Sequence, residues 1–181
     1  MRKITFGGAN SLDNYFARPD GSVDWLMWSD ELAAFMTDYW KTIDTILMGR
    51  KTYDFAIGQK RGKSKKHLYS GIKTYVFSRS LNQDEHRGVE IISENAEDFV
   101  RDLKNQPGKD ICLMGGGNFA RTLFEAGLID EIGFNIHPVL LGRGIPLFYE
   151  MNRQIDLELI ECKTFKNGCV LISYRVKKED L

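Results

Sequence analysis

The sequence predicts an α/β fold, a sandwich built on a mostly parallel sheet with an antiparallel edge. Two observations predict it. Segments with strand and helix patterns alternate over the first two thirds of the 181 residues, as is typical of parallel sheets. Near the end, two alternating runs flank Asn167 and Gly168, the dipeptide most typical of a β-hairpin turn. No repeat or long linker is visible, so residues 1–181 are expected to form a single domain.

Apolar spacing and turn residues place the elements in order. A short strand opens the chain. Leu32, Phe35 and Tyr39 then recur at helical spacing after Ser29, a suitable N-cap. Proline and glycine end two later helices, before Pro107 and at Gly127. Strands are expected over 45–48, 72–80, 89–93 and 110–114 and within 129–138, and helices over 29–44, after Gly49, over 95–106 and over 118–126.

The closing hairpin allows a prediction of register. If Asn167 and Gly168 form a two-residue turn, Cys162 pairs with Ser173, which keeps Cys162 and Cys169 from forming a disulfide. Alternate residues of the second run share one face, which should point into the core: Val170, Ile172, Tyr174 and Val176.

Composition excludes several classes of protein. Lys plus Arg and Asp plus Glu number 25 each, so no overall field attracts nucleic acid or a membrane surface. The N-terminus resembles neither a signal peptide nor a membrane span. An odd number of cysteines favours a reducing compartment, and a cytoplasmic location is expected. Cys112, Cys162 and Cys169 are expected to be small buried apolar residues, and His67, His86 and His137 lack metal-ligand spacing.

The basic run over 60–66 is interpreted as a solvated loop or a lid beside a ligand rather than as a nucleic-acid site, because no aromatic residue lies within it.

Candidate ligand-binding segments follow three of the expected strands. Ligands of open α/β sheets bind at the carboxyl ends of the strands. Glycine-freed backbone amides at a helix start can hold a diphosphate, and arginine at a strand end can accept the 2′-phosphate that distinguishes NADP from NAD. No G-x-G-x-x-G spacing opens the first βα unit, which disfavours an ordinary Rossmann domain. The three segments are Gly49, Arg50, Lys51 and Thr52; Ser78, Arg79 and Ser80; and Gly115, Gly116, Gly117, Asn118 and Phe119.

These segments resemble a known family. "SLDNYFARPDGSVDWL", "ILMGRKTYD", "YVFSRS", "LMGGGNFARTLFEAGLIDEIGFNIHPVLLGRGIPLF" and the closing hairpin are similar, in this order, to the dihydrofolate-reductase-like superfamily. Within it, the chain resembles most the stand-alone relatives of the riboflavin-biosynthesis reductase domain. The resemblance implies a three-layer sandwich, a mixed, mainly parallel sheet of about eight strands, and a cis peptide between two of the three glycines.

The resemblance also implies a function: an NADPH-dependent reductase, most like 5-amino-6-(5-phosphoribosylamino)uracil reductase, acting on a pyrimidine or pterin-like substrate. It implies that the first and third segments hold the diphosphate and nicotinamide, that Ser78 and Arg79 read the adenosine ribose and its 2′-phosphate, and that the protein forms a homodimer. A dihydrofolate reductase and a non-catalytic NADPH- or pterin-binding protein are the alternatives. The paired aspartates and proline that usually follow the first segment in the riboflavin enzymes are missing, and Asp54 stands alone.

The substrate side is less specific. Hydride transfer leaves a charge that must be protonated, and the nearest matches to the acid on the first helix of dihydrofolate reductases are Asp30 and Glu31, with Asp24 as another candidate. Both helix residues could instead only favour the helix dipole. Trp25, Trp28 and Phe35 could enclose a flat heterocycle or belong to the core.

Overall fold

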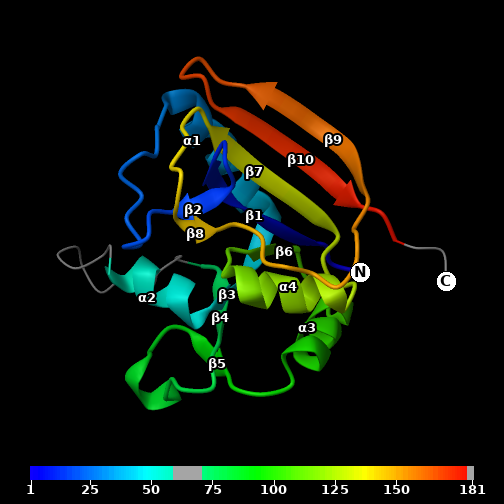
Figure 1. The fold of residues 1–181 in the computed structure, drawn as a ribbon. Helices are drawn as coiled ribbons and strands as arrows, with labels where there is room; N and C mark the ends of the chain where they lie inside the picture. The colour runs from blue at the N-terminus through cyan, green and yellow to red at the C-terminus, as the bar shows by residue number, and fades with distance from the viewer. Residues whose placement is uncertain (59–70, 179–181) are drawn as a thin grey trace.

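An eight-stranded mixed sheet forms the middle of the protein, in the order β5-β4-β3-β6-β1-β7-β10-β9 (Figure 1). The structure is a computed structural model that describes residues 1–58 and 71–178. Neighbouring strands are parallel from β5 to β7, and β10 and β9 are antiparallel additions. The bounds are β1 Ile4–Ser11, β3 Ile43–Gly49, β4 Lys73–Phe77, β5 Glu90–Ile92, β6 Asp110–Leu113, β7 Glu131–His137, β9 Leu157–Thr164 and β10 Val170–Val176. The predicted α/β class and the antiparallel edge are confirmed.

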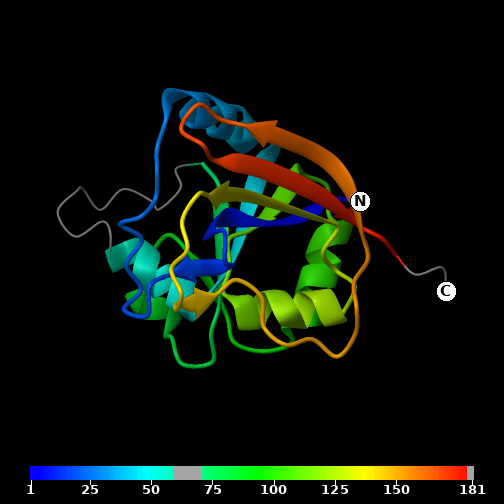
Figure 2. The same ribbon diagram turned by 45° about the horizontal axis from the view of Figure 1, so that its top comes forward.

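Helices cover both faces of the sheet and complete three layers. Figure 2 shows α1 (Asp30–Thr42) on one side, with α3 (Ala96–Asn105) and α4 (Gly117–Glu125) on the other. Tyr53 of α2 (Arg50–Gly58) packs on Ile46 and Met48 together with α1 side chains, so α2 shares the α1 face. The main core lies on the opposite face, where Phe6, Leu47 and other strand residues meet α3 and α4. Because both faces are covered there, Ile46, Leu47 and Met48 of β3 are buried in succession, on both sides of the sheet.

Local signals explain where the helices begin. Ser29 Oγ accepts a hydrogen bond from the Leu32 amide at 3.2 Å and caps α1, as the sequence predicts. The N-cap of α4 is Gly116, which has no side chain, so no side-chain hydrogen bond satisfies the first amides of that helix. The Gly115–Gly116 peptide is cis, as the family resemblance implies.

A buried ion pair between Lys104 and Asp130 links the first strand, β1, to the helix α3. Lys104 of α3 is 3% exposed, and its Nζ donates to the Leu128 carbonyl at 2.7 Å and to the carboxylate of Asp130. The same carboxylate accepts from the Ile4 amide at 2.9 Å. Asp130 therefore ties α3, the start of β1 and the turn before β7 together.

The hairpin register predicted from the sequence is wrong by one residue. Cys162 pairs with Ile172, not with Ser173. The Phe165 amide donates to the Cys169 carbonyl and Gly168 adopts φ +85°, so three residues and not two connect the strands. Three-residue loops of this kind place glycine at their left-handed position, and a local pattern does not distinguish them from two-residue turns.

The predicted core face of β10 is only partly right. Tyr174 and Val176 pack against the main core, whereas Val170 and Ile172 are half-buried. The buried residue of this strand is Leu171, which points to the other face and packs near α1. A sheet covered on both sides buries residues of both parities, so alternation alone does not identify the core face.

Two further expectations need correction or lie outside the structure. Cys112 and Cys169 are buried, but Cys162 is exposed on the edge strand β9, contrary to the prediction. A small second sheet joins β2 (Tyr15–Ala17) to β8 (Ile145–Pro146), two strands that the sequence did not predict. The basic run over 60–66 lies outside the described residues. Within the described ranges, no helix is both long enough and apolar enough to cross a membrane.

Candidate active site

The three predicted ligand-binding segments lie side by side. They follow β3, β4 and β6, which are neighbours in the order β4-β3-β6 and run in parallel. The Gly49 amide donates to the Gly115 carbonyl at 2.9 Å, and the Met114 amide donates to the Leu47 carbonyl at 2.9 Å. These bonds hold the first and third segments together at the carboxyl edge of the sheet.

A cleft of about 1220 Å³ opens along this edge, and we call it the strand-end cleft. Phe16 and Ala17 of β2 and Tyr149 contribute to its lining. The Phe119 ring stacks on Phe77 with 4.2 Å between centroids, which ties the start of α4 to the end of β4. Of the twelve predicted coenzyme residues, eleven line this cleft: Gly49, Arg50, Lys51, Thr52, Ser78, Arg79, Ser80, Gly116, Gly117, Asn118 and Phe119.

The strand-end cleft suits an anion. The N-termini of α2 and α4 both border it, and helix N-termini carry partial positive charge and unpaired amides. Arg50 Nη1 donates to Ser80 Oγ at 3.2 Å and its Nε lies 3.7 Å from an Asp54 carboxylate oxygen. Lys51 and Arg79 are exposed and form no ion pair with any residue that the structure describes. The cleft can therefore offer free cations to a phosphate.

Glycine occupies the three positions after β6 for different physical reasons. Gly115 adopts φ +117°, a conformation that side chains disfavour. A Cβ on Gly117 would lie 2.4 Å from the Tyr149 ring, so contact within the chain requires glycine there. A Cβ on Gly116 would meet nothing closer than Thr52 Oγ1 at 3.7 Å, and it would project beside the cleft. Only Gly116 thus keeps open a cradle that a side chain would fill.

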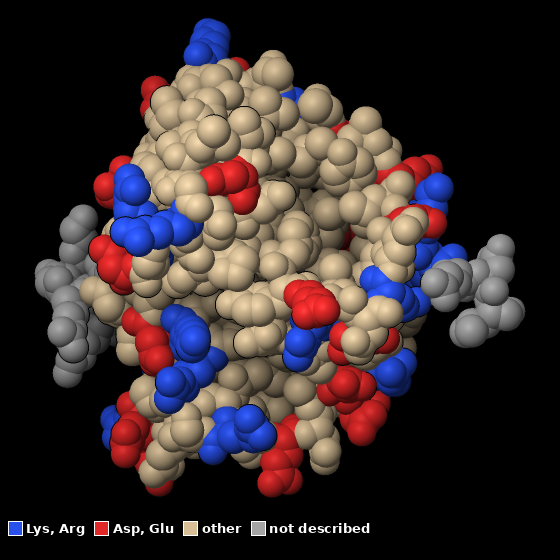
Figure 3. All heavy atoms as spheres, in the orientation of Figure 1, with Lys and Arg blue, Asp and Glu red and all other residues tan. Residues whose placement is uncertain are grey.

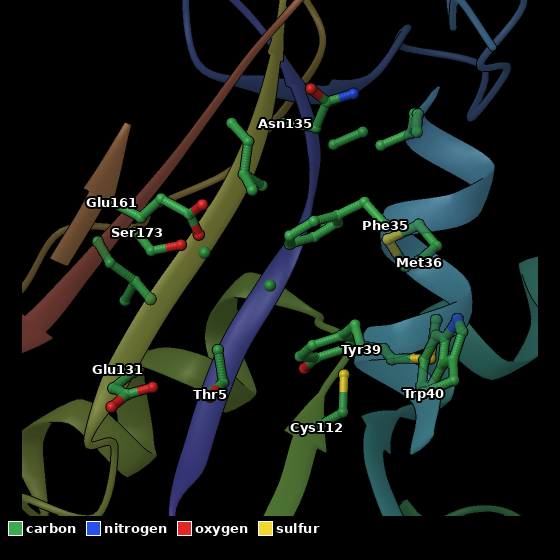
Figure 4. A pocket seen from close by; sticks show the side chains of 18 of the residues that line it. Thr5, Phe35, Met36, Tyr39, Trp40, Cys112, Glu131, Asn135, Glu161 and Ser173 are labelled. Carbon is green, nitrogen blue, oxygen red and sulfur yellow. The ribbon is translucent and has the colours of Figure 1, made fainter. Parts of the chain in front are cut away.

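A second hollow lies between α1 and the sheet, and we call it the α1 cavity. It has a volume of about 420 Å³. Figure 4 shows Phe35, Met36 and Tyr39 of α1 on one side and Ser173 and Glu161 of the hairpin on the other. Its polar lining comes from Thr5, Glu131, Asn135, His137, Glu161 and Ser173.

Most ionisable groups of the α1 cavity either form an ion pair or favour their uncharged form. Glu131 accepts from Lys3 Nζ at 2.9 Å. Burial raises the pKa of Cys112 to about 11 and raises the pKa of Tyr39 as well, so both stay protonated near neutral pH. Burial lowers the pKa of His137, whose Nδ1 accepts from the Met27 amide at 3.1 Å. Glu161 alone among the carboxylates of the described lining has no ion pair.

The cleft and the α1 cavity meet. Both are lined by Gly7, Gly8 and Ala9 of β1, by Leu26 and by Met114. Ligands in the two hollows would therefore lie against the same segment of β1. Sites that hold two reactants need this arrangement.

The predicted acids are not at this junction. Asp30 and Glu31 are exposed at the start of α1, and neither is among the residues that line the cleft or the α1 cavity. Glu31 Oε2 accepts from the Lys166 amide at 3.1 Å, a link to the hairpin. Asp24 is exposed and pairs with Arg18 at 2.6 Å, a hydrogen bond that lowers the Asp24 pKa.

The predicted aromatic residues are divided. Trp28 and Phe35 line the α1 cavity, although Trp28 is 72% exposed. Trp25 is buried and packs edge-on against His137, with 5.3 Å between ring centroids. Its position therefore agrees with the core interpretation.

Several lining residues were missed by sequence reasoning, above all those of β7 and the hairpin. In "EIGFNIH", Glu131, Gly133, Asn135 and His137 occupy alternate positions of a strand whose other residues are apolar. Polar residues and glycine on one face of a central strand indicate a site, because a central strand is usually apolar on both faces. The sequence alone does not show that this strand is central. Glu161 and Ser173 had no such signal.

On the face shown in Figure 3, acidic and basic residues are interspersed, in agreement with the neutral composition. Among the described residues, no group of three His, Cys, Asp or Glu is placed to hold a metal ion.

Comparison with known proteins agrees with this architecture. Two proteins of Bacillus subtilis (strain 168), both described as uncharacterized, are similar over their length. YyaP is 38% identical over 182 residues, which cover 96% of this chain and 95% of YyaP. YwjB is 35% identical over 167 residues, which cover 91% and 92%.

Two solved structures show the same fold. A putative riboflavin biosynthesis protein from Shewanella sp. PV-4 has a TM-score of 0.79 at 26% identity, covering 98% of this chain and all of that one. Dihydrofolate reductase from Enterococcus faecalis, complexed with NADP(H), has a TM-score of 0.67 at 15% identity, covering 97% of each chain. The model of the RibD C-terminal domain family matches residues 2–171. With its dihydrofolate-reductase-like sheet, the chain therefore belongs to the RibD C-terminal domain family.

Proposed function

We propose that the protein is an NADPH-dependent reductase that delivers hydride to a pyrimidine or pterin-like ring. The observation that carries this proposal is the junction of two hollows of different character. The strand-end cleft has free cations and helix N-termini, and the α1 cavity is walled by aromatic and thioether side chains. They share the backbone of Gly7, Gly8 and Ala9.

The residues of the strand-end cleft fit a phosphorylated dinucleotide. The amides at the starts of α2 and α4 would hold the diphosphate, and the open side of Gly116 lets it approach the backbone. Arg79, with Ser78 and Ser80 beside it, would hold the 2′-phosphate. When bound, NADPH would supply the hydride. The shared wall of β1 would exclude water where the two reactants meet.

The proton that completes the reduction needs a donor. Asp30 and Glu31 remain the candidates from the sequence, and their exposed positions require the substrate or a water to extend to the start of α1. The variants Asp30→Asn and Glu31→Gln test this role separately. Turnover that falls while substrate affinity is kept would support either acid, and unchanged turnover would exclude it.

The family supports an aminouracil ribosyl phosphate as substrate. One structural neighbour is described as a putative riboflavin biosynthesis protein, and another, from Thermotoga maritima, as a deaminase and 5-amino-6-(5-phosphoribosylamino)uracil reductase. A dihydrofolate reductase is the second candidate, favoured by the similarity of fold to the Enterococcus enzyme. A binding protein without turnover is the third, favoured by the absence of paired aspartates after the first segment.

The deciding experiment measures NADPH oxidation with dihydrofolate and with the aminouracil ribosyl phosphate, after titration of the protein with NADPH and NADH. Tighter binding of NADPH than of NADH is expected. Equal affinities would contradict the proposed role of the strand-end cleft. If NADPH binds and neither substrate is consumed, the binding protein is favoured. Tight methotrexate binding would favour dihydrofolate reductase.

Two further properties remain proposals: a cytoplasmic location and a homodimer. For the dimer, β9 is the outermost strand of the sheet and exposes Leu157, Leu159 and Ile160. Much of the upper part of the surface in Figure 3 carries no charged residue. Unpaired apolar edge strands commonly pair with another chain.

A further inference from the structure

We propose that the α1 cavity selects a planar substrate without phosphate or carboxylate, and that Glu161 imposes this selection. The inference rests on the proposed function and narrows its substrate class. It disfavours the phosphorylated aminouracil and favours a neutral or cationic ring with N–H groups.

The shape of the cavity floor indicates a flat ligand. Across four strands, Gly7 of β1 pairs with Gly133 of β7, Gly133 with Ser173 of β10, and Ser173 with Glu161 on the edge strand β9. Paired residues lie on one face of a sheet, so this row begins with two positions that have no side chain. The bare row leaves space against the backbone, and Phe35 faces it from α1 (Figure 4). A planar ring fits between such walls.

The row ends in two side chains that form hydrogen bonds. The Ser173 hydroxyl and the Glu161 carboxylate lie together at the hairpin side of the cavity (Figure 4). A carboxylate accepts hydrogen bonds and cannot donate them. The Ser173 hydroxyl can both donate and accept, so ring N–H and amino groups are the substrate groups that Glu161 in particular can recognise.

The charges of the cavity point the same way. Its described lining contains the carboxylates of Glu131 and Glu161 and no Lys or Arg. Lys3 is engaged with Glu131, and the ammonium of Lys163 lies over the Phe35 ring, 5.6 Å from its centroid, outside the lining. Glu161 is an exposed residue of the edge strand β9 and forms no ion pair with a described residue, so an anionic substituent at this end of the cavity would meet an unpaired like charge.

The two hollows thus divide the charge between them. Three cations, Arg50, Lys51 and Arg79, and one carboxylate, Asp20, line the strand-end cleft, whereas the α1 cavity holds only carboxylates among its described charged side chains. Such a division places the anionic reactant in the cleft and rejects it from the cavity, which is selection by repulsion as well as by attraction.

The test uses two matched pairs of compounds and isothermal titration calorimetry without NADPH. One pair is the aminouracil riboside and its 5′-phosphate; the other is 6-hydroxymethylpterin and pterin-6-carboxylate. We expect the uncharged member of at least one pair to bind at least about tenfold more tightly than its anionic partner. Anionic members that bind as tightly as their partners, or no binding by either uncharged compound, would overturn the inference.

Glu161→Gln tests the assigned residue. It should reduce the preference to less than about threefold, mainly by tighter binding of the anionic compound. Glu158→Gln is the matched control on the same strand, because Glu158 pairs with Arg175 at 3.0 Å and lies outside the lining of the cavity. An unchanged preference in Glu161→Gln, or an equal loss in Glu158→Gln, would refute the role of Glu161.

The two proposals fail separately. Selective binding of the uncharged compound with no NADPH oxidation would refute the reductase and leave the selection intact. NADPH oxidation with only the phosphorylated substrate would refute the selection and leave the reductase intact.

Discussion

Replacing Lys104 with Met should destabilise the protein far more than an equivalent change on the surface. The side chain of Lys104 is 4% exposed and that of its partner Asp130 is 16% exposed. Lys104→Met keeps most of the volume of the side chain, but it leaves the Asp130 carboxylate without its buried partner and the Leu128 carbonyl without a donor. Both losses occur where water cannot easily compensate.

The magnitude follows from this burial. Breaking a buried ion pair by removing one partner typically costs about 3–5 kcal/mol. Lys178 Nζ remains 3.3 Å from the other oxygen of Asp130, and the Ile4 amide still donates to that carboxylate. We therefore expect the low end, about 3 kcal/mol, which for a chain of this length lowers Tm by roughly 6–12 °C.

The assay is urea denaturation at pH 7, with Lys41→Met as control. Lys41 pairs with Asp38 at 2.7 Å, but the two side chains are 70% and 78% exposed. Exposed helix pairs contribute about 0.3–0.5 kcal/mol. A Lys104→Met variant that loses no more free energy of unfolding than Lys41→Met would refute the reasoning from burial.

Three other predictions address the site, the core and the edge. Arg79→Ala should weaken NADPH binding about tenfold and leave NADH binding unchanged, and Arg87→Ala should change neither, as fluorescence titration can check. Because burial lowers the pKa of His137, this side chain binds a proton more readily in the unfolded chain than in the folded chain. Its contribution to the free energy of unfolding is therefore fully present above about pH 7 and is lost as the pH falls toward 5. Urea denaturation of His137→Gln should show a smaller fall over that range, and an equal fall would contradict the argument. If two copies pair through β9, Leu159→Lys should give a monomer in light scattering; an unchanged mass would place the interface elsewhere or exclude it.

Much of the fold could be predicted because its signals are local. Ser29 caps α1 through its own side chain, and the glycines after β6 begin α4. The hairpin was predicted at the right place, but its register was wrong because a three-residue loop and a two-residue turn share the same Asn-Gly signal. One residue of difference changes every partner along two strands.

The candidate site divides in the same manner. The three segments predicted to bind the coenzyme could be placed together because helix starts and strand ends are read from neighbouring residues, and eleven of their twelve residues line one cleft. The α1 cavity depends on pairings between distant segments. Gly7 and Gly133 become one bare surface only when β1 lies beside β7, and Glu161 reaches it only through β10.

The sequence by itself determined the class of fold and the Ser29 cap of α1 from contacts within a few residues, and the family from the order of its motifs along the chain. It also placed three segments at strand ends, for which anion binding is a prediction. The tertiary structure alone decided that Gly117 faces Tyr149, that Asp30 lies outside the cavity, and that carboxylates rather than cations line it. Strand order and register bring together residues more than a hundred positions apart, and no local pattern contains that information.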